Sequence, residues 1–195
     1  RARERVIWRI GILEDTAGEI IGTVLEHMEQ IFLRQKNYTA SVHDLRCVSQ
    51  RSYQDIADTY FRAETAPRGA EIHFLTPTSF KQGGAYILLP ESVLILQSLL
   101  LRWNAFCPDI RIEEDNLAQE LASHIHLTRY ALRSATYSVE GYNIRGFRGQ
   151  IALRFTGSDM VRRILATLLA YAPYAGIGIK TALGMGAVET DIWKG

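Results

Sequence analysis

The chain has little of what marks several common classes of protein. Its two cysteines, Cys47 and Cys107, are too few for a disulfide-stabilised scaffold and lack the spacing of a zinc site, so we expect buried free thiols in a cytoplasmic protein. No apolar run reaches the roughly 18 residues of a membrane-spanning helix. Only five of 195 residues are proline and 47% are apolar, which excludes a disordered composition and leaves room for one large or two small domains.

The charge is unevenly distributed along the chain. The net charge is only +1, but residues 121–195 carry nine basic and four acidic side chains, whereas residues 1–120 carry 13 basic and 17 acidic ones. A basic excess in the C-terminal part is able to attract a polyanion. An ordinary solvated surface explains the same counts, so charge alone does not decide between them.

The first part of the chain predicts a strand, a helix and a strand. Residues 6–13 are mostly apolar and predict a strand. Asp15 or Thr16 is placed to cap a helix that continues to Phe32. Apolar and polar residues alternate over residues 38–48, which predicts a second strand. We expect residues 1–64 to be the C-terminal half of a ferredoxin-like domain whose first half lies upstream. Residues 53–61 predict a short helix, and ETAPRG predicts a linker.

Residues 70–195 predict a complete second ferredoxin-like domain with one inserted helix. The helices are expected over residues 92–106, 113–124 and from an Asp159 cap, and the strands over residues 70–80, 127–139, 143–156 and 187–193. A turn at Glu140-Gly141 joins the central strands in a hairpin. The fold class is therefore α+β, with tandem ferredoxin-like (RRM-like) domains, the first incomplete at its N-terminal side.

A glycine-rich segment, GIGIKTALGMG, joins the last helix to the last strand. It follows a helix and has Thr181 where a dinucleotide fingerprint needs glycine, so it is not a Rossmann loop. Glycines allow a phosphate to approach the backbone, and Lys180 would add a charge in the resulting anion nest. Helix capping explains one or two of these glycines equally well. The four glycines are Gly176, Gly178, Gly184 and Gly186.

This G-x-G-x5-G-x-G spacing, with a lysine in the middle five, resembles the C-terminal motif of the CRISPR-associated endoribonucleases that process precursor CRISPR RNA. These belong to the repeat-associated mysterious protein (RAMP) superfamily. Three further stretches are similar to that family: FLTPTSFKQGGAY, LLLRWNAF and RYALRSATYSVEGYNIRGFRGQIALRF. The resemblance covers residues 74–188 and implies two tandem ferredoxin-like domains.

The resemblance also implies a reaction. A ribose 2′-hydroxyl would attack the adjacent phosphate within a CRISPR repeat RNA, without metal or cofactor, and leave a 2′,3′-cyclic phosphate. That reaction needs a base, an acid and positive charge at the phosphate. Many family members take a histidine from the first helix of the first domain, a region that we expect to be missing here. Effector-complex proteins or a fused partner domain are the expected protein partners.

The histidines of this chain offer no match to that position. His27 is predicted at the edge of the apolar face of its helix, and His43 and His73 are predicted to be packed among the apolar neighbours on their strands, so all three are expected to be structural. His124 and His126 form an H-x-H motif, but no acidic residue or cysteine completes a metal site nearby. His126 is the best candidate for acid–base work within the chain, and the catalytic residues are otherwise unknown.

Four arginines on the central hairpin are candidates for RNA binding. Arg129 and Arg133 are four residues apart on one strand and therefore share a face, and Arg145 and Arg148 lie on the next strand. Two rival interpretations stay open. One is a non-catalytic RNA-binding RAMP subunit, and the other is a small-molecule or structural ferredoxin-like module whose glycine loop is only a tight connection.

Overall fold

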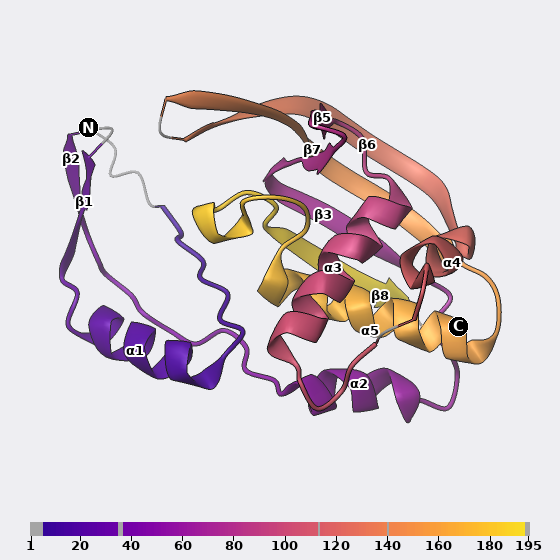
Figure 1. Ribbon diagram of the computed structural model, residues 1–195. Helices are drawn as coiled ribbons and strands as arrows, with labels where there is room; N and C mark the ends of the chain where they lie inside the picture. Colours follow the sequence, from indigo (N-terminus) through magenta and orange to yellow (C-terminus); the bar gives the residue numbers. More distant parts are fainter. Residues whose placement is uncertain (1–5, 35–36, 113, 140, 194–195) are drawn as a thin grey trace. The chain divides into compact units, whose positions relative to one another are not determined.

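The computed structural model describes residues 6–34, 37–112, 114–139 and 141–193, which divide into two compact units. The first unit covers residues 1–51 and the second residues 52–195. Figure 1 shows the elements of both. None of the helices in the described parts is long and apolar enough to cross a membrane.

The first unit holds one helix and one hairpin. Helix α1 spans Asp15–Glu26, and strands β1 (Gln30–Leu33) and β2 (Tyr38–Ser41) pair antiparallel. The helix expected to reach Phe32 therefore ends before a strand that contains Phe32, an aromatic residue that favours strands. The strand expected over residues 6–13 is not formed, because an extended segment needs a neighbouring strand to pair its backbone groups. That residues 1–64 are half of a ferredoxin-like domain stays a prediction.

The second unit has the ferredoxin-like order β-α-β-β-α-β. The elements are α2 (Tyr53–Phe61), β3 (Gly69–Thr78), β4 (Phe80–Gln82), β5 (Ala85–Ile87), α3 (Ser92–Phe106), α4 (Leu117–Ser123), β6 (Ile125–Val139), β7 (Tyr142–Phe155), α5 (Asp159–Ala175) and β8 (Val188–Trp193). The sheet has the strand order β6-β7-β3-β8, with all neighbours antiparallel. A small β4–β5 hairpin and helix α4 are insertions.

Side-chain alternation along β3 explains how the sheet is covered. Ala70, Ile72 and Phe74 are buried, and helices α3 and α5 lie side by side over that face of the sheet (Figure 1). Trp103 of α3 packs edge-on against Tyr171 of α5, with ring centroids 5.2 Å apart. Helix α5, which leads into the glycine-rich segment, is thus fixed against helix α3 by an aromatic contact in the core.

Helix α2 belongs to the second compact unit, which begins at Ser52. The Arg163 guanidinium of α5 donates to the Tyr60 carbonyl at the end of α2 and to the Ala63 carbonyl at 2.9 Å. Ser52 caps α2 by accepting from the Asp55 N–H. The structure thus joins the predicted short helix to the second domain.

Several local predictions need correction. Ser158, and not Asp159, caps α5, because its hydroxyl accepts from the Val161 N–H at 3.3 Å. Helix α4 is shorter than expected, and Glu113 and Glu140, where a helix start and a turn were predicted, lie outside the described residues. Cys107 is buried as expected, but Cys47 is exposed.

Candidate functional site

The glycine-rich segment leaves α5 at Gly176 and reaches β8 through a short 3-10 turn over Thr181–Leu183. All four of its glycines have positive φ angles, between 67° and 94°. Lys180 also has a positive φ, 52°, which is uncommon for a residue with a side chain. The backbone of this segment therefore follows a path that L-residues rarely adopt, and the glycines make it accessible.

Three of these glycines are required by contacts inside the protein. Gly176, Gly178 and Gly186 are buried. A side chain at Gly178 would collide with the Ser79 carbonyl oxygen, and one at Gly186 would collide with the Ile177 carbonyl oxygen. At Gly178 and Gly186 the space that a side chain would fill is thus taken by protein backbone, and at Gly176 it is taken by the Thr181 side chain. That RNA contacts these three glycines stays a prediction. Only Gly184 is exposed.

Hydrogen bonds hold the segment on both sides. The Gly178 N–H donates to the Ser98 hydroxyl at 3.2 Å, and the Arg102 guanidinium donates to the Gly178 carbonyl at 2.5 Å. The end of β3 and the residue after it supply two acceptors, each at 3.0 Å. The Pro77 carbonyl accepts from the Gly186 N–H, and the Ser79 carbonyl accepts from the Ile179 N–H. The segment is a fixed part of the fold.

The tip of the segment is the part left open. Lys180 is exposed, and within the described part of the chain the N–H groups of Lys180, Thr181 and Ala182 have no hydrogen-bond acceptor. The anion nest stays a prediction, and these three N–H groups at the tip are the ones free to form it. The buried glycines around it fix where the tip lies.

Strands β6 and β7 form a long ribbon that carries the four candidate arginines. Arg133 lies directly opposite Arg148, and Arg129 lies on the same face, as predicted from its spacing. Arg145 pairs with Thr136 and points to the opposite face, because it is three residues from Arg148. The structure therefore brings three of the four arginines onto one face.

These three arginines differ in their partners. The Arg129 guanidinium lies 3.1 Å from a Glu71 carboxylate oxygen, so that charge is already paired. Neither Arg133 nor Arg148 has an acidic or hydrogen-bonding partner among the described residues, and the Arg148 Nε is buried without an acceptor. Like charges directly opposite on two strands repel each other. A bound anion would offset this repulsion at the Arg133–Arg148 pair.

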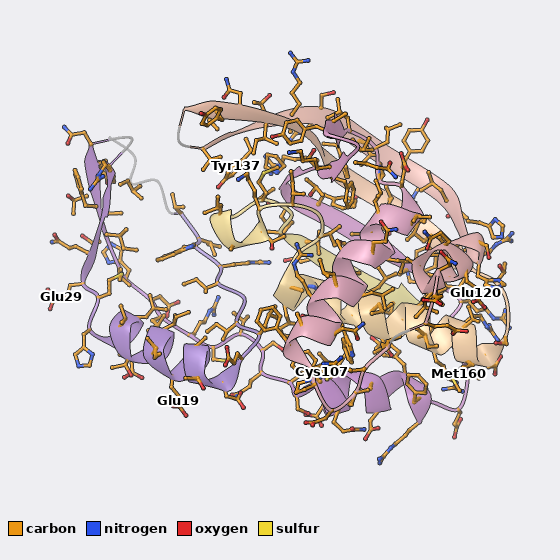
Figure 2. All side chains as sticks on the ribbon, viewed as in Figure 1. Glu19, Glu29, Cys107, Glu120, Tyr137 and Met160 are labelled. Carbon is orange, nitrogen blue, oxygen red and sulfur yellow. The ribbon has the colours of Figure 1, made fainter. Side chains whose placement is uncertain are left out.

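Tyr137, which sequence reasoning missed, connects this ribbon to the glycine-rich segment. Its hydroxyl donates to the Leu183 carbonyl, and its ring lies between the ribbon and the segment (Figure 2). Tyr137 shares a ribbon face with Arg133, four residues away, or about 13 Å along the strand. Alternation along the strand was the one signal able to show that these two residues share a face.

His126 lies far from this arrangement. It is exposed opposite Arg154 near the start of β6, with its Nε2 3.5 Å from the Thr156 hydroxyl. Eleven residues separate it from Tyr137, which corresponds to about 35 Å of strand. The structure thus separates the candidate acid–base histidine from Lys180 and from the arginine pair.

His73 is more exposed than expected from its position in β3. Its side chain is 44% exposed, and its Nε2 lies 3.6 Å from a Glu71 carboxylate oxygen on the open face of the sheet. The expected packing of His73 is therefore wrong, because no helix among the described residues covers that face of the sheet. Within the described ranges, no cluster of three or more histidine, cysteine or acidic side chains has the geometry to hold a metal ion.

Comparison with known proteins adds the family context. The family model of the CRISPR-associated endoribonuclease Cas6 matches residues 72–188. The CRISPR-associated endoribonuclease Cas6 of Mycobacterium tuberculosis is 29% identical over 193 residues, or 98% of this chain and 60% of that protein. That of Streptococcus thermophilus is 28% identical over 199 residues and is covered to 77%. The chain thus spans about 60% of the length of the first of these relatives.

A solved structure shares the fold. The Cas6 chain of a product complex superposes with a TM-score of 0.75 over 91% of this chain and 73% of that one, at 21% identity. The predicted α+β class with tandem ferredoxin-like folds is confirmed by this neighbour.

Proposed function

The chain belongs to the CRISPR-associated endoribonuclease Cas6 family, and we propose that it binds precursor CRISPR RNA and takes part in cutting it within the repeats. The cut would follow attack of a ribose 2′-hydroxyl on the adjacent phosphate, without a metal ion, and would leave a 2′,3′-cyclic phosphate. Residues of this chain would supply the binding surface and positive charge at the RNA backbone.

The observation that carries the proposal is the unpaired cross-strand arginine pair. Arg133 and Arg148 lie opposite each other, without an acidic partner among the described residues, on the ribbon face that holds Tyr137. Tyr137 contacts the segment whose tip carries Lys180. Arg133, Arg148 and Lys180 are therefore carried by elements that contact one another. Such a series of positive charges is suited to bind the phosphates of an RNA strand.

The proposed reaction assigns different tasks to different residues. Lys180, with the free N–H groups beside it, would stabilise charge on a phosphate, and Arg133 and Arg148 would hold the strand in register. Arg129 and Arg145 stay predicted RNA contacts, although Glu71 already pairs with the first and the second faces the other way. Gly184 is the glycine of the segment whose exposed backbone is accessible to RNA.

A second candidate function is RNA binding without cleavage. The separation of about 35 Å along β6 between His126 and the contact point at Tyr137 favours it, because an acid or base must reach the proton that it transfers. Under this alternative the chain is a non-catalytic RAMP subunit that holds the repeat RNA and supplies no proton-transferring group. Association with effector-complex proteins or a fused domain stays a prediction in both cases.

One assay separates the two functions. End-labelled repeat RNA is incubated with the chain in EDTA and resolved on a denaturing gel, beside a repeat with a single 2′-deoxy substitution at the cut site. A single cut that the deoxy substitution abolishes establishes the nuclease. Binding without a cut establishes the binding function, and absence of both contradicts the proposal.

A further inference from the structure

We infer that Arg102 and Ser98 are positioning residues that hold the glycine-rich segment so that Lys180 meets the RNA; this inference rests on the proposed function. Both residues lie one helical turn apart on α3 and face Gly178. Neither is part of the exposed tip. Their effect on RNA would therefore pass through the segment that they hold.

The two residues bond both backbone polar groups of Gly178, its N–H and its carbonyl. The Ser98 hydroxyl accepts the Gly178 N–H at 3.2 Å and donates to the Ile95 carbonyl at 2.9 Å. The Arg102 guanidinium donates to the Gly178 carbonyl at 2.5 Å and to the Ser98 carbonyl at 2.9 Å. The planar guanidinium suits this task, because its donors are fixed in a fork that one ammonium group does not reproduce.

Arg102 and Ser98 together form a clamp on Gly178, and the helix that carries them is held by the core. Trp103, next to Arg102, is fully buried, donates its indole N–H to the Ile110 carbonyl at 2.6 Å and packs on Tyr171 of α5. Helix α5 leads directly into Gly176. The clamp therefore joins the segment to the same core that positions its starting point, as a preorganised site requires.

The location of Arg102 argues against a direct contact with RNA. The side chain is partly buried, and burial lowers the pKa of its guanidinium below the ordinary range. Its described hydrogen bonds go to two carbonyl oxygens inside the protein. Lys180 lies two residues beyond the clamped Gly178 and is exposed, so it is the charge that the clamp presents.

The first measurement is amide hydrogen exchange in Arg102→Gln, Ser98→Ala and a matched control, Asn104→Ala. Asn104 is also on α3, and its amide group bonds both backbone groups of Ile112, away from the glycine-rich segment. We expect faster exchange at Gly178 and Ile179 in the first two variants and unchanged exchange there in the control. Unchanged exchange in Ser98→Ala and Arg102→Gln would overturn the clamp without any use of RNA.

The second measurement is affinity for repeat RNA in a double-mutant cycle. We expect Arg102→Gln to weaken binding about tenfold in the wild-type background and less than about twofold in Lys180→Ala, because coupled residues are not additive. Equal losses in both backgrounds would overturn the positioning role. If Lys180→Ala alone leaves affinity unchanged, the proposed function of the tip fails, while the exchange experiment still decides the clamp. Should Arg102→Gln not fold, Ser98→Ala takes its place in the cycle.

Discussion

Arg133 and Arg148 lie directly opposite each other on strands β6 and β7, without an acidic neighbour among the described residues. A protein that bound nothing here would gain stability by losing one of these charges. The pair therefore has two measurable properties. We expect it to cost stability in the free chain and to strengthen binding of a polyanion.

We predict that Arg148→Ala and Arg133→Ala weaken binding of repeat RNA and reduce its dependence on salt. Each lost phosphate contact lowers the slope of log affinity against log salt by about 0.7 for single-stranded RNA. Removal of one of two opposed charges would stabilise the free chain by about 0.2–1 kcal/mol, less whatever packing the arginine stem supplied. Filter binding at several salt concentrations and urea unfolding measure the two effects.

Arg154→Ala is the matched control for this prediction. Arg154 is an exposed arginine on the same strand, six residues from Arg148 and opposite His126. We expect its loss to change the salt slope much less. An equal effect of all three substitutions would mean that RNA responds to net charge alone and that the opposed pair has no special role.

Tyr137→Phe tests the connection between the ribbon and the glycine-rich segment. The substitution removes the hydroxyl that donates to the Leu183 carbonyl and keeps the ring. Loss of one such hydrogen bond lowers the free energy of unfolding by about 0.5–1.5 kcal/mol. Because the segment is then held less firmly, we expect a loss of similar size in the free energy of RNA binding. Tyr142→Phe, at an exposed tyrosine of the same ribbon, is the control. RNA affinity that is equal in both variants would contradict the connection.

The sequence alone predicted the elements whose periodicity is strong. Helix α3 was predicted over residues 92–106 and is observed over Ser92–Phe106, because its apolar residues recur at helical spacing. The β6–β7 ribbon followed from alternation over two adjacent segments. The shared face of Arg129 and Arg133 followed from strand geometry and needed no tertiary information.

What the sequence did not reveal depends on contacts between distant residues. The opposition of Arg133 and Arg148 depends on the register of the ribbon, which shifts between Leu127 and Arg129. The need for Gly178 depends on the Ser79 carbonyl, far away in the chain. Residues 6–13 have the composition of a strand, but whether they form one depends on a partner strand.

The two cysteines are predicted to differ in reactivity. Cys47 is exposed, whereas Cys107 is buried and burial raises the pKa of its thiol. A raised pKa keeps the thiol protonated, so its contribution to stability is present below the ordinary thiol pKa and is lost as the pH rises through the folded-state value. We expect iodoacetamide at pH 8 to modify Cys47 quickly and Cys107 only in urea, which mass spectrometry would detect. Rapid modification of both would contradict the burial of Cys107.

Alanine substitutions at selected glycines distinguish two costs of a side chain, the strain of a positive φ angle and the collision with a neighbouring carbonyl oxygen. Gly178→Ala and Gly186→Ala introduce a side chain at positive φ and also against a carbonyl oxygen, so we expect a loss of more than about 2 kcal/mol in the free energy of unfolding. Gly83→Ala is the matched control, because Gly83 has a φ of 56° but open space around it. Its loss should stay near 1 kcal/mol, the cost of the conformation alone. Equal losses at Gly83 and Gly178, measured by urea unfolding, would mean that the glycines of the segment serve its conformation and not its close approach to Ser79.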